Sequence, residues 1–464
     1  MTETYKRPTF SEKLLFLLLL LFPLSYPFGP FIINCFIFSV IFFFFVFCFQ
    51  INSFSWLKSK IFLIALPFFF FIIFVSTIKY YDNNYLLKSL GYFRFLLFSV
   101  AIFFFFLKTK LKIFIIIISY IFFVILLCLD IIFQFIFKVD ILGYPPLLFG
   151  ERYAGFFGKE AIAGGFIYVF GFVNLALLAK IMPSSKKHFV FFSVFSLFLS
   201  TMLITGDRLP VACFVVALIF SFFFLKDKKF FFSIFFISLF ILLTSIFFNK
   251  NIRHRYINSP LHLLNTSKLD LFSQEYQMRN AFKIIENKTL DDFLQFKKEF
   301  DIINDRKNVL EGRSYSKYNI ILYKFLDTQW GAHALTALEM FKNNIFLGSG
   351  FGSFRFECHK YDKIDSLSRI DRCSTHPHNI YFEILSELGL IGFVFFLIFL
   401  FSYFYFFLKI KDKDFFIVCI YSIIFGFLFP KTSGSFFSTT YGTYFWYLYG
   451  ISFFYLEYKW KKKQ

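Results

Sequence analysis

Residues 113–137 read IFIIIISYIFFVILLCLDIIFQFIF, a run in which Asp130 is the only formally charged residue. About 20 consecutive apolar residues form a helix long enough to cross the hydrocarbon core of a bilayer, so this run predicts a membrane-spanning helix. Comparable runs recur along the 464 residues, of which 58% are hydrophobic. We therefore predict an all-α polytopic membrane protein, because no soluble fold fits such a sequence.

The apolar runs predict about twelve membrane helices. The first two runs are separated only by a short turn that contains Pro23, Pro27, Gly29 and Pro30. The predicted spans are residues 13–28, 30–49, 60–78, 90–107, 113–137, 162–181, 189–205, 210–225, 230–248, 379–408, 415–430 and 441–458.

Basic residues predict the orientation of these helices. With the N-terminus in the cytoplasm, 21 lysines and arginines fall on the cytoplasmic side and seven fall in the short loops on the other side. Cytoplasmic loops carry the excess of positive charge, so both termini are predicted to be cytoplasmic. This distribution explains the net charge of +20 without a nucleic-acid partner. The first apolar run lacks a small-residue cleavage site and predicts a membrane helix, not a removed signal peptide.

Two connections on the outer side are longer than the rest. Residues 138–161 form a medium loop, and residues 249–377 separate the ninth and tenth spans and include a helical amphipathic pattern at 334–341. A segment of that length and patterning predicts a small, mostly helical domain that covers the outer face. The predicted organisation is therefore helices 1–9 in residues 1–248, the loop domain in residues 249–377 and helices 10–12 in residues 378–464.

The sequence His376-Pro377-His378-Asn379 stands where the long polar segment meets the tenth span. Proline suits the first turn of a helix, and helix N-termini favour anions. A neutral imidazole can take a proton from a hydroxyl as that hydroxyl attacks, so His378 is a candidate catalytic base. The alternative is that His378 is only an interfacial residue that caps the helix.

Several charged side chains lie within the predicted spans or at their ends. Glu383 and Glu387 follow Asn379 by one and two helical turns on roughly the same face. Acidic residues inside a span are costly and tend to be functional, although these two could also be shallow enough to be hydrated. Arg94 and Asp130 could pair with each other and be structural.

Two arginines in the outer loops are candidate anion ligands. Arg208 follows the seventh span in Thr205-Gly206-Asp207-Arg208, where a guanidinium can hold a phosphate through two hydrogen bonds. The alternative is a surface turn formed by Asp207 and Arg208. Arg152 lies among glycines, which let the backbone approach an anion, but an ordinary loop arginine fits equally well.

The outer loop domain contains further candidates. His333 and Arg355 flank the sequence Gly-Ser-Gly-Phe-Gly at 348–352, which lacks the following Lys-Ser/Thr of a nucleotide-binding P-loop. Cys358 and Cys373 share this loop, and a disulfide between them is predicted if the loop lies outside the cytoplasm; otherwise both are free thiols. No Cys-x-x-Cys pair indicates a metal site.

The motifs together resemble the O-antigen ligase and O-antigen polymerase superfamily of bacterial envelopes. The resemblance rests on His378-Asn379, followed nine residues later by Gly389-x-x-Gly392, and on the preceding segment 337–355. Thr205-Gly206-Asp207-Arg208 resembles the arginine turn of that family. Twelve spans with a large outer loop between the ninth and tenth also resemble its layout.

The resemblance implies glycan transfer from undecaprenyl diphosphate to an acceptor hydroxyl, without a metal, a cofactor or a nucleotide sugar. The acceptor would be lipid A-core for a ligase or another glycan repeat for a polymerase, and membrane lipids would surround the protein. The active site would face the periplasm from the bacterial inner membrane. By motif, His378 would be the acceptor-activating base, Arg208 a diphosphate ligand, and Gly389 and Gly392 a structural motif. The expected substrate-binding residues are Arg152, Asn379, His333, Arg355 and Glu383.

One departure from the family leaves the second diphosphate ligand open. The family's ligases carry an arginine shortly before the segment that begins here at Trp330, whereas residues 325–329 contain none. His333, Arg313 or Arg279 could replace it, and ligase and polymerase remain open. A transporter of lipid-linked oligosaccharide or polysaccharide is the alternative from another class, but it would need charged residues deep in several spans. A scaffold with a sensory outer domain would not need Arg208 and His378 together.

Overall fold

The computed structural model describes residues 9–79, 83–109, 113–147, 152–158, 160–181, 187–258, 329–361, 373–409, 414–420 and 434–461. The regular structure of these ranges is helical, and their only β pairing is an isolated bridge between Leu147 and Arg152. Arg279 and Arg313 lie outside the described residues, as do most of the predicted loop domain and most of the eleventh predicted span.

Six segments in the described ranges are long and apolar enough to cross a membrane, and three more helices are apolar but shorter. The helices of the first half are α1 (Phe10–Leu21), η1 (Phe22–Phe28), α2 (Gly29–Gln50), η2 (Ser55–Lys58), α3 (Lys60–Lys79), α4 (Asn83–Tyr92), α5 (Arg94–Lys108), α6 (Ile113–Phe137), η4 (Gly155–Phe157), α7 (Ala163–Phe166), η5 (Ile167–Phe172) and α8 (Val173–Ile181). Those of the second half are α9 (Lys187–Ile204), α10 (Arg208–Phe224), α11 (Lys228–Phe248), α12 (Lys250–Arg253), η6 (His254–Asn258), α17 (Gln329–Asn343), α18 (Phe354–Glu357), η7 (Cys358–Tyr361), α19 (Ile380–Leu408) and α21 (Thr439–Lys461).

The first two predicted spans form a helical hairpin. The short helix η1 connects α1 to α2, and Gly29 begins α2 with φ of 83°, a conformation that glycine adopts without steric cost. The Ser11 hydroxyl, at the start of α1, donates a hydrogen bond to the side-chain oxygen of Gln50, at the end of α2. The two helices are therefore antiparallel.

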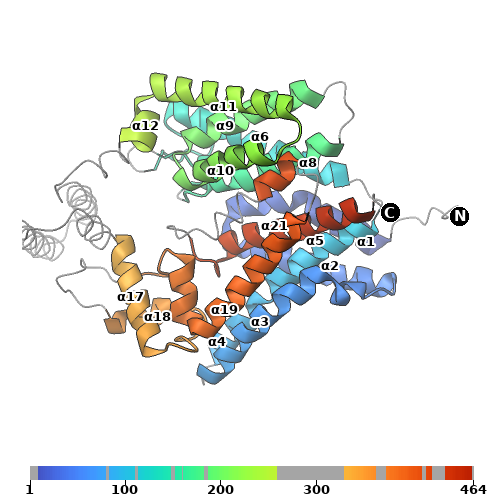
Figure 1. Ribbon diagram of the computed structural model, residues 1–464, viewed down its shortest axis with the longest axis vertical. Coiled ribbons are helices and arrows are strands. Elements are labelled where there is room, and N and C mark those ends of the chain that lie inside the picture. The colour runs from blue at the N-terminus through green and yellow to red at the C-terminus, as the bar shows by residue number, and fades with distance from the viewer. Residues whose placement is uncertain are drawn as a thin grey trace, which may run out of the picture.

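Helices α5 and α21 pack together at the centre of the structure, where they lie side by side (Figure 1). Nearly every side chain of α5 from Phe95 to Phe106 is buried. A Cβ added at Gly450 of α21 would lie 2.6 Å from the carbonyl oxygen of Ser99, so the two helices are in backbone contact there. Aromatic packing extends this core to α3, because Phe69 contacts Trp446 with ring centroids 5.0 Å apart.

The expected pair between Arg94 and Asp130 is not formed. Arg94 donates from Nε to Asn34 at 3.0 Å, and its other hydrogen bonds go to Gly91 and Thr439. Asp130 accepts a hydrogen bond from the backbone N–H of Ile141 at 2.9 Å. The prediction was wrong because each side chain bonds to other residues, Arg94 to groups of α2, α4 and α21 and Asp130 to the backbone after α6.

The segment before the tenth span packs directly against that span. Helix α17 packs along α19 (Figure 1), and α19 bends at Gly389, where φ is 66°. At this bend the N–H of Leu390 donates to the carbonyl of Ile345 at 2.7 Å, so the segment after α17 docks directly onto the α19 backbone.

Candidate functional site

His378 stands one residue before the cap of α19, in a left-handed conformation with φ of 53°. The side-chain oxygen of Asn379 accepts hydrogen bonds from the N–H groups of Tyr381 at 2.9 Å and Phe382 at 3.2 Å. Asn379 is therefore the N-cap, and α19 begins at Ile380. The expectation that Pro377 occupies the first turn was wrong, because the asparagine cap starts the helix two residues later.

Three histidines meet at this point. The His378 ring stacks on that of His333 from α17, with centroids 5.2 Å apart and planes 22° apart. The His376 ring lies 4.1 Å from that of His378 and hydrogen-bonds through Nδ1 with the hydroxyl of the exposed Thr375. The left-handed backbone at His378 is costly for a residue other than glycine, and it turns this ring toward the other two.

Burial keeps the two stacked histidines neutral. Burial lowers the pKa of His333 from 6.5 to about 4, helped by the neighbouring His378 and opposed by the backbone of Cys373. Burial also lowers the pKa of His378. Within the described chain, neither ring nitrogen of His333 makes a hydrogen bond of ordinary geometry. Both imidazoles are therefore uncharged at neutral pH, which is the state a general base needs.

Glu383 and Glu387 are buried and hold the loops around the histidines. Glu387 accepts hydrogen bonds from the N–H groups of Gly352 at 2.7 Å and Phe354 at 3.2 Å. Glu383 accepts from the Ser435 hydroxyl at 2.5 Å and from the N–H of Phe436 at 2.9 Å. Each carboxylate thus fixes one loop against α19. Arg355 is exposed on α18, within electrostatic range of both glutamates.

Both motif glycines lie in close contacts, Gly389 with backbone and Gly392 with side chains. A Cβ on Gly389 would lie 2.4 Å from the carbonyl oxygen of Phe346, and a Cβ on Gly348 would lie 2.5 Å from the N–H nitrogen of Gly389. One turn further along α19, a Cβ on Gly392 would lie 2.9 Å from the ring of Phe71 on α3. Both positions therefore have no room for a side chain.

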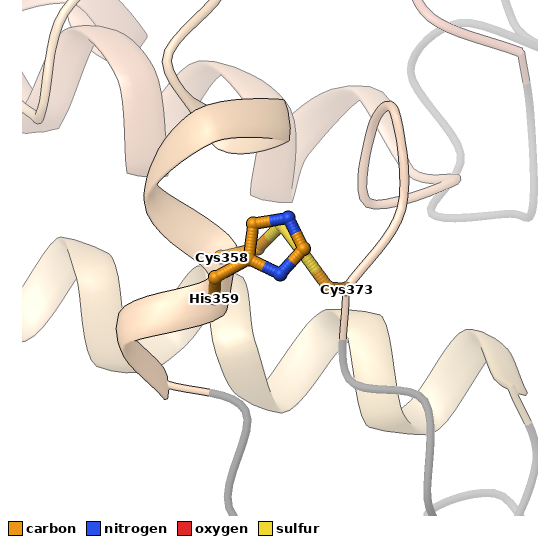
Figure 2. Close-up of side chains that lie close together, drawn as sticks. All are labelled: Cys358, His359 and Cys373. Atoms are coloured by element: carbon orange, nitrogen blue, oxygen red, sulfur yellow. A yellow bond between two sulfur atoms is a disulfide. The ribbon is translucent and has the colours of Figure 1, made fainter.

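Cys358 and Cys373 are joined in a disulfide beside the histidine cluster (Figure 2). The bond connects η7 to the segment that leads into His376. The side chain of His359 lies close to both sulfur atoms, and three such side chains could hold a metal ion. While the sulfur atoms are bonded to each other neither is a thiolate, so only the imidazole remains as a ligand.

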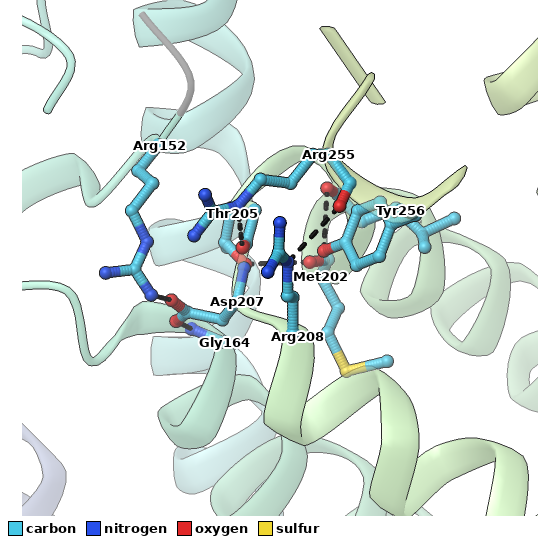
Figure 3. A network of polar contacts seen from close by, with 10 residues as sticks. Arg152, Gly164, Met202, Thr205, Asp207, Arg208, Arg255 and Tyr256 are labelled. Atoms are coloured by element: carbon cyan, nitrogen blue, oxygen red, sulfur yellow. Dashed lines mark hydrogen bonds and ion pairs between the residues drawn. The ribbon is translucent and has the colours of Figure 1, made fainter. Parts of the chain in front are cut away.

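A second polar cluster lies where α9 turns into α10 (Figure 3). The buried carboxylate of Asp207 pairs with Arg152 at 2.6 Å and accepts the N–H of Gly164 at 2.9 Å. Burial raises the pKa of Asp207, while Arg152, Gly164 and Arg255 act in the opposite direction. Arg152 is thus engaged by a carboxylate, and of the two residues in the alternative surface turn Asp207 is buried while Arg208 is exposed.

Arg208 and Arg255 complete this cluster. Arg208 is exposed at the start of α10 and donates from Nε to the carbonyl of Arg255 at 3.2 Å. Arg255 donates from Nε to the carbonyl of Gly206 at 3.2 Å. Arg152 thus pairs with the Asp207 carboxylate, Arg255 interacts with it electrostatically, and Arg208 bonds to the backbone of Arg255 (Figure 3). Arg255 was not among the residues predicted from the sequence, although it follows the ninth span directly on the predicted outer side.

The start of α21 lies between the two clusters. Tyr441 is within electrostatic range of Glu383, and Tyr444 is within electrostatic range of Asp207. Tyr444 also stacks on Tyr26 of η1, with ring centroids 5.2 Å apart and planes 7° apart. In Figure 1, α12 and α17 lie toward the same side of the molecule, one above the other. The start of α21 therefore connects the buried glutamate of the histidine cluster with the buried aspartate of the arginine cluster.

Comparison with known families identifies the segment that holds the histidine group. Residues 331–397 match the family model described as O-antigen ligase. This match supports membership of the O-antigen ligase and polymerase superfamily, as the motifs predicted. No curated protein matches the chain.

The matched residues contain the stacked histidines, both buried glutamates, the disulfide and the two motif glycines. The arginine cluster precedes the matched segment. The family match together with the apolar helices supports a multi-pass membrane protein of the glycan ligase or polymerase type.

Proposed function

We propose that the protein transfers a glycan from undecaprenyl diphosphate to an acceptor hydroxyl at the periplasmic face of the bacterial inner membrane. The observation that carries this proposal is the neutral, left-handed His378 at the start of α19, within the segment that matches the O-antigen ligase model. Its ring stacks on the buried His333, and its helix is held by two buried carboxylates.

In this reaction the acceptor oxygen attacks the anomeric carbon of the donor glycan. His378 takes the proton of the hydroxyl as the new carbon–oxygen bond forms. The bond between the anomeric carbon and the phosphate oxygen breaks, and undecaprenyl diphosphate leaves with the electron pair. Because negative charge grows on the leaving group, fixed cations near it contribute strongly to the rate.

Arg208 and Arg255 are the proposed ligands of the leaving diphosphate. Arg208 is exposed, and its planar fork fits two phosphate oxygens. Arg255 supplies the second cation that the sequence left open. Arg152 would act indirectly, because its pairing with Asp207 and the bond from Gly164 to the same carboxylate fix the turn that carries Arg208.

Asn379 and Glu383 are proposed as positioning residues that act through His378. The side-chain oxygen of Asn379 caps α19, and the carboxylate of Glu383 holds the loop before α21. His333 and Arg355 remain proposed contacts of the acceptor. Ligase and polymerase differ only in whether the acceptor is lipid A-core or another glycan repeat, and both use the same chemistry at His378.

The decisive experiment uses purified protein in proteoliposomes, with a polyprenyl-diphosphate-linked oligosaccharide as donor. His378→Ala should retain its fold and donor binding but transfer glycan at less than about a hundredth of the wild-type rate, since a general base contributes roughly 10²–10⁴-fold. His359→Ala is the matched control, because this exposed histidine belongs to the same outer segment. Transfer by His378→Ala above about a tenth of the wild-type rate would contradict the assignment of the base.

A further inference from the structure

Arg94 is a half-buried cation whose partners are all neutral. Its guanidinium donates to Asn34 of α2 at 3.0 Å, to the carbonyl of Gly91 at 2.5 Å and to the hydroxyl of Thr439 on α21 at 3.5 Å. It also lies 4.3 Å from the centroid of the Phe95 ring. Within the described chain, no carboxylate pairs with it.

The other arginines that the structure describes in buried surroundings have their charge compensated. Arg152 pairs with Asp207 at 2.6 Å. Arg253 donates to the carbonyls of Ile246 and Phe247 in the last turn of α11, where the helix dipole is negative. Arg94 likewise donates to a carbonyl in the last turn of a helix, that of Gly91 in α4, but it also stands where α5 and α21 begin, and helix starts are positive. Taking a charge out of water without a counter-charge is costly, so this position favours an anion beside Arg94.

Arg94 retains hydrogen-bond donors for such an anion. A guanidinium has five N–H donors, and the three hydrogen bonds use one on each nitrogen. One N–H therefore remains on each terminal nitrogen and can donate to a phosphate oxygen. The side chain is partly exposed, so a ligand can reach it.

Arg94 also lies beside the proposed active site. Thr439, which it contacts, follows the loop that Glu383 holds through Ser435 and Phe436. Tyr92, two residues before Arg94, donates from its hydroxyl to the carbonyl of Phe436 at 3.3 Å. The same loop thus connects Arg94 to the helix that begins after His378.

We propose that Arg94, with Asn34 and Thr439, binds the phosphate of the lipid-linked acceptor. This inference rests on the proposed function and adds a second lipid-phosphate site to it. The donor diphosphate would lie at Arg208 and Arg255, the acceptor phosphate at Arg94, and His378 between them. Two lipid substrates held by two separate cations would place the acceptor hydroxyl near the base without moving the donor.

The test measures lipid binding and transfer by the full-length protein in phosphatidylcholine nanodiscs. Titration with undecaprenyl phosphate, followed by native mass spectrometry, should show two bound equivalents for the wild type. Arg94→Gln should lose one equivalent, and Arg208→Gln should lose the other. In the transfer reaction, Arg94→Gln should raise the KM for the acceptor about tenfold or more with the KM for the donor unchanged, since charged hydrogen bonds are of that strength. Arg253→Gln is the matched control and should change neither KM.

Three outcomes would overturn the inference. One is an unchanged acceptor KM in Arg94→Gln. Another is a rise in both KM values with a lower melting temperature, which indicates a purely structural arginine. The third is displacement of undecaprenyl phosphate from this site by an equal amount of phosphatidylglycerol, which indicates a site for bulk headgroups. If Arg94→Gln does not fold, Arg94→Lys is the test variant. It keeps the positive charge but lacks the planar guanidinium, so it should fold and still raise only the acceptor KM.

The inference and the proposed function fail in different ways. Absence of glycan transfer by the wild type would remove the proposed function and the acceptor assignment together. Normal transfer with an unchanged acceptor KM in Arg94→Gln would remove only the inference.

Discussion

At the scale of single residues, the environment of His378 sets its chemistry. The sequence predicted which histidine matters, because His378 precedes the apolar helix and Asn379 can cap it. It could not predict the stack with His333, since the two residues lie 45 positions apart and meet only when α17 packs on α19. The sequence also could not predict that Arg208 is exposed whereas Arg152 forms an ion pair with Asp207.

The pH dependence of transfer is predicted from the lowered pKa of His378. A base must be neutral to act, and a lowered pKa keeps the imidazole neutral to a more acidic pH. The acid limb of kcat/KM should therefore have its midpoint below pH 6.5, the ordinary value for histidine. His333→Phe should leave that midpoint below 6.5, because His333 titrates near 4 and is neutral in this range. A wild-type midpoint at or above pH 6.5 would contradict the burial of the base.

The same lowered pKa values have a consequence for stability. Above pH 6.5 the two histidines are mostly neutral in both the folded and the unfolded chain. In that range they contribute nothing to the pH dependence of stability. As the pH falls from 6.5 toward 4, the unfolded chain binds protons that the folded His333 does not accept. Stability should therefore decline across this window, and the decline should be smaller in His333→Phe.

At the scale of elements, the bend of α19 at Gly389 lets the segment after α17 pack against the α19 backbone. Gly-x-x-Gly was predicted as a structural motif, and the structure shows the contacts that exclude a side chain at both positions. The partner of Gly389 was not predictable, because Gly348 lies in a loop whose path depends on the carboxylate of Glu387. The sequence indicated that Glu387 shares a face with Asn379, but not that its oxygens bind the backbone of Gly352 and Phe354.

Two glycine substitutions separate backbone strain from crowding. Gly389 and Gly352 have similar φ values, 66° and 71°, but only Gly389 is crowded, whereas a Cβ on Gly352 would have nothing within 4 Å. Gly352→Ala should therefore cost only the strain of a left-handed alanine, about 1 kcal/mol. Gly389→Ala should cost several times as much and lower the yield of folded protein, because two backbone segments must separate. Thermal unfolding in detergent measures both, and equal losses would contradict the backbone contact.

At the scale of the whole molecule, the candidate groups stand beside the ends of helices. His378 precedes α19, Arg208 begins α10, Arg255 follows α11 and Arg94 begins α5. With the predicted alternation of spans, all four positions fall on the outer side. This common side is a prediction from hydropathy and charge alone. The lateral arrangement needs the packing of α21 against α5, which depends on the shape of Gly450 and its aromatic neighbours.

The orientation itself is the last prediction, and it follows from the 21 basic residues on one side and seven in the short loops on the other. Lys342→Cys places a thiol on the exposed surface of α17, and Lys229→Cys places one on the exposed start of α11. With Cys35 replaced by serine, a membrane-impermeant maleimide should label Lys342→Cys in intact spheroplasts and Lys229→Cys only after lysis. The reverse pattern would put His378 and the arginines in the cytoplasm. A reducing cytoplasm does not preserve a disulfide such as Cys358–Cys373, so the reverse pattern would also require that bond to be open in the cell.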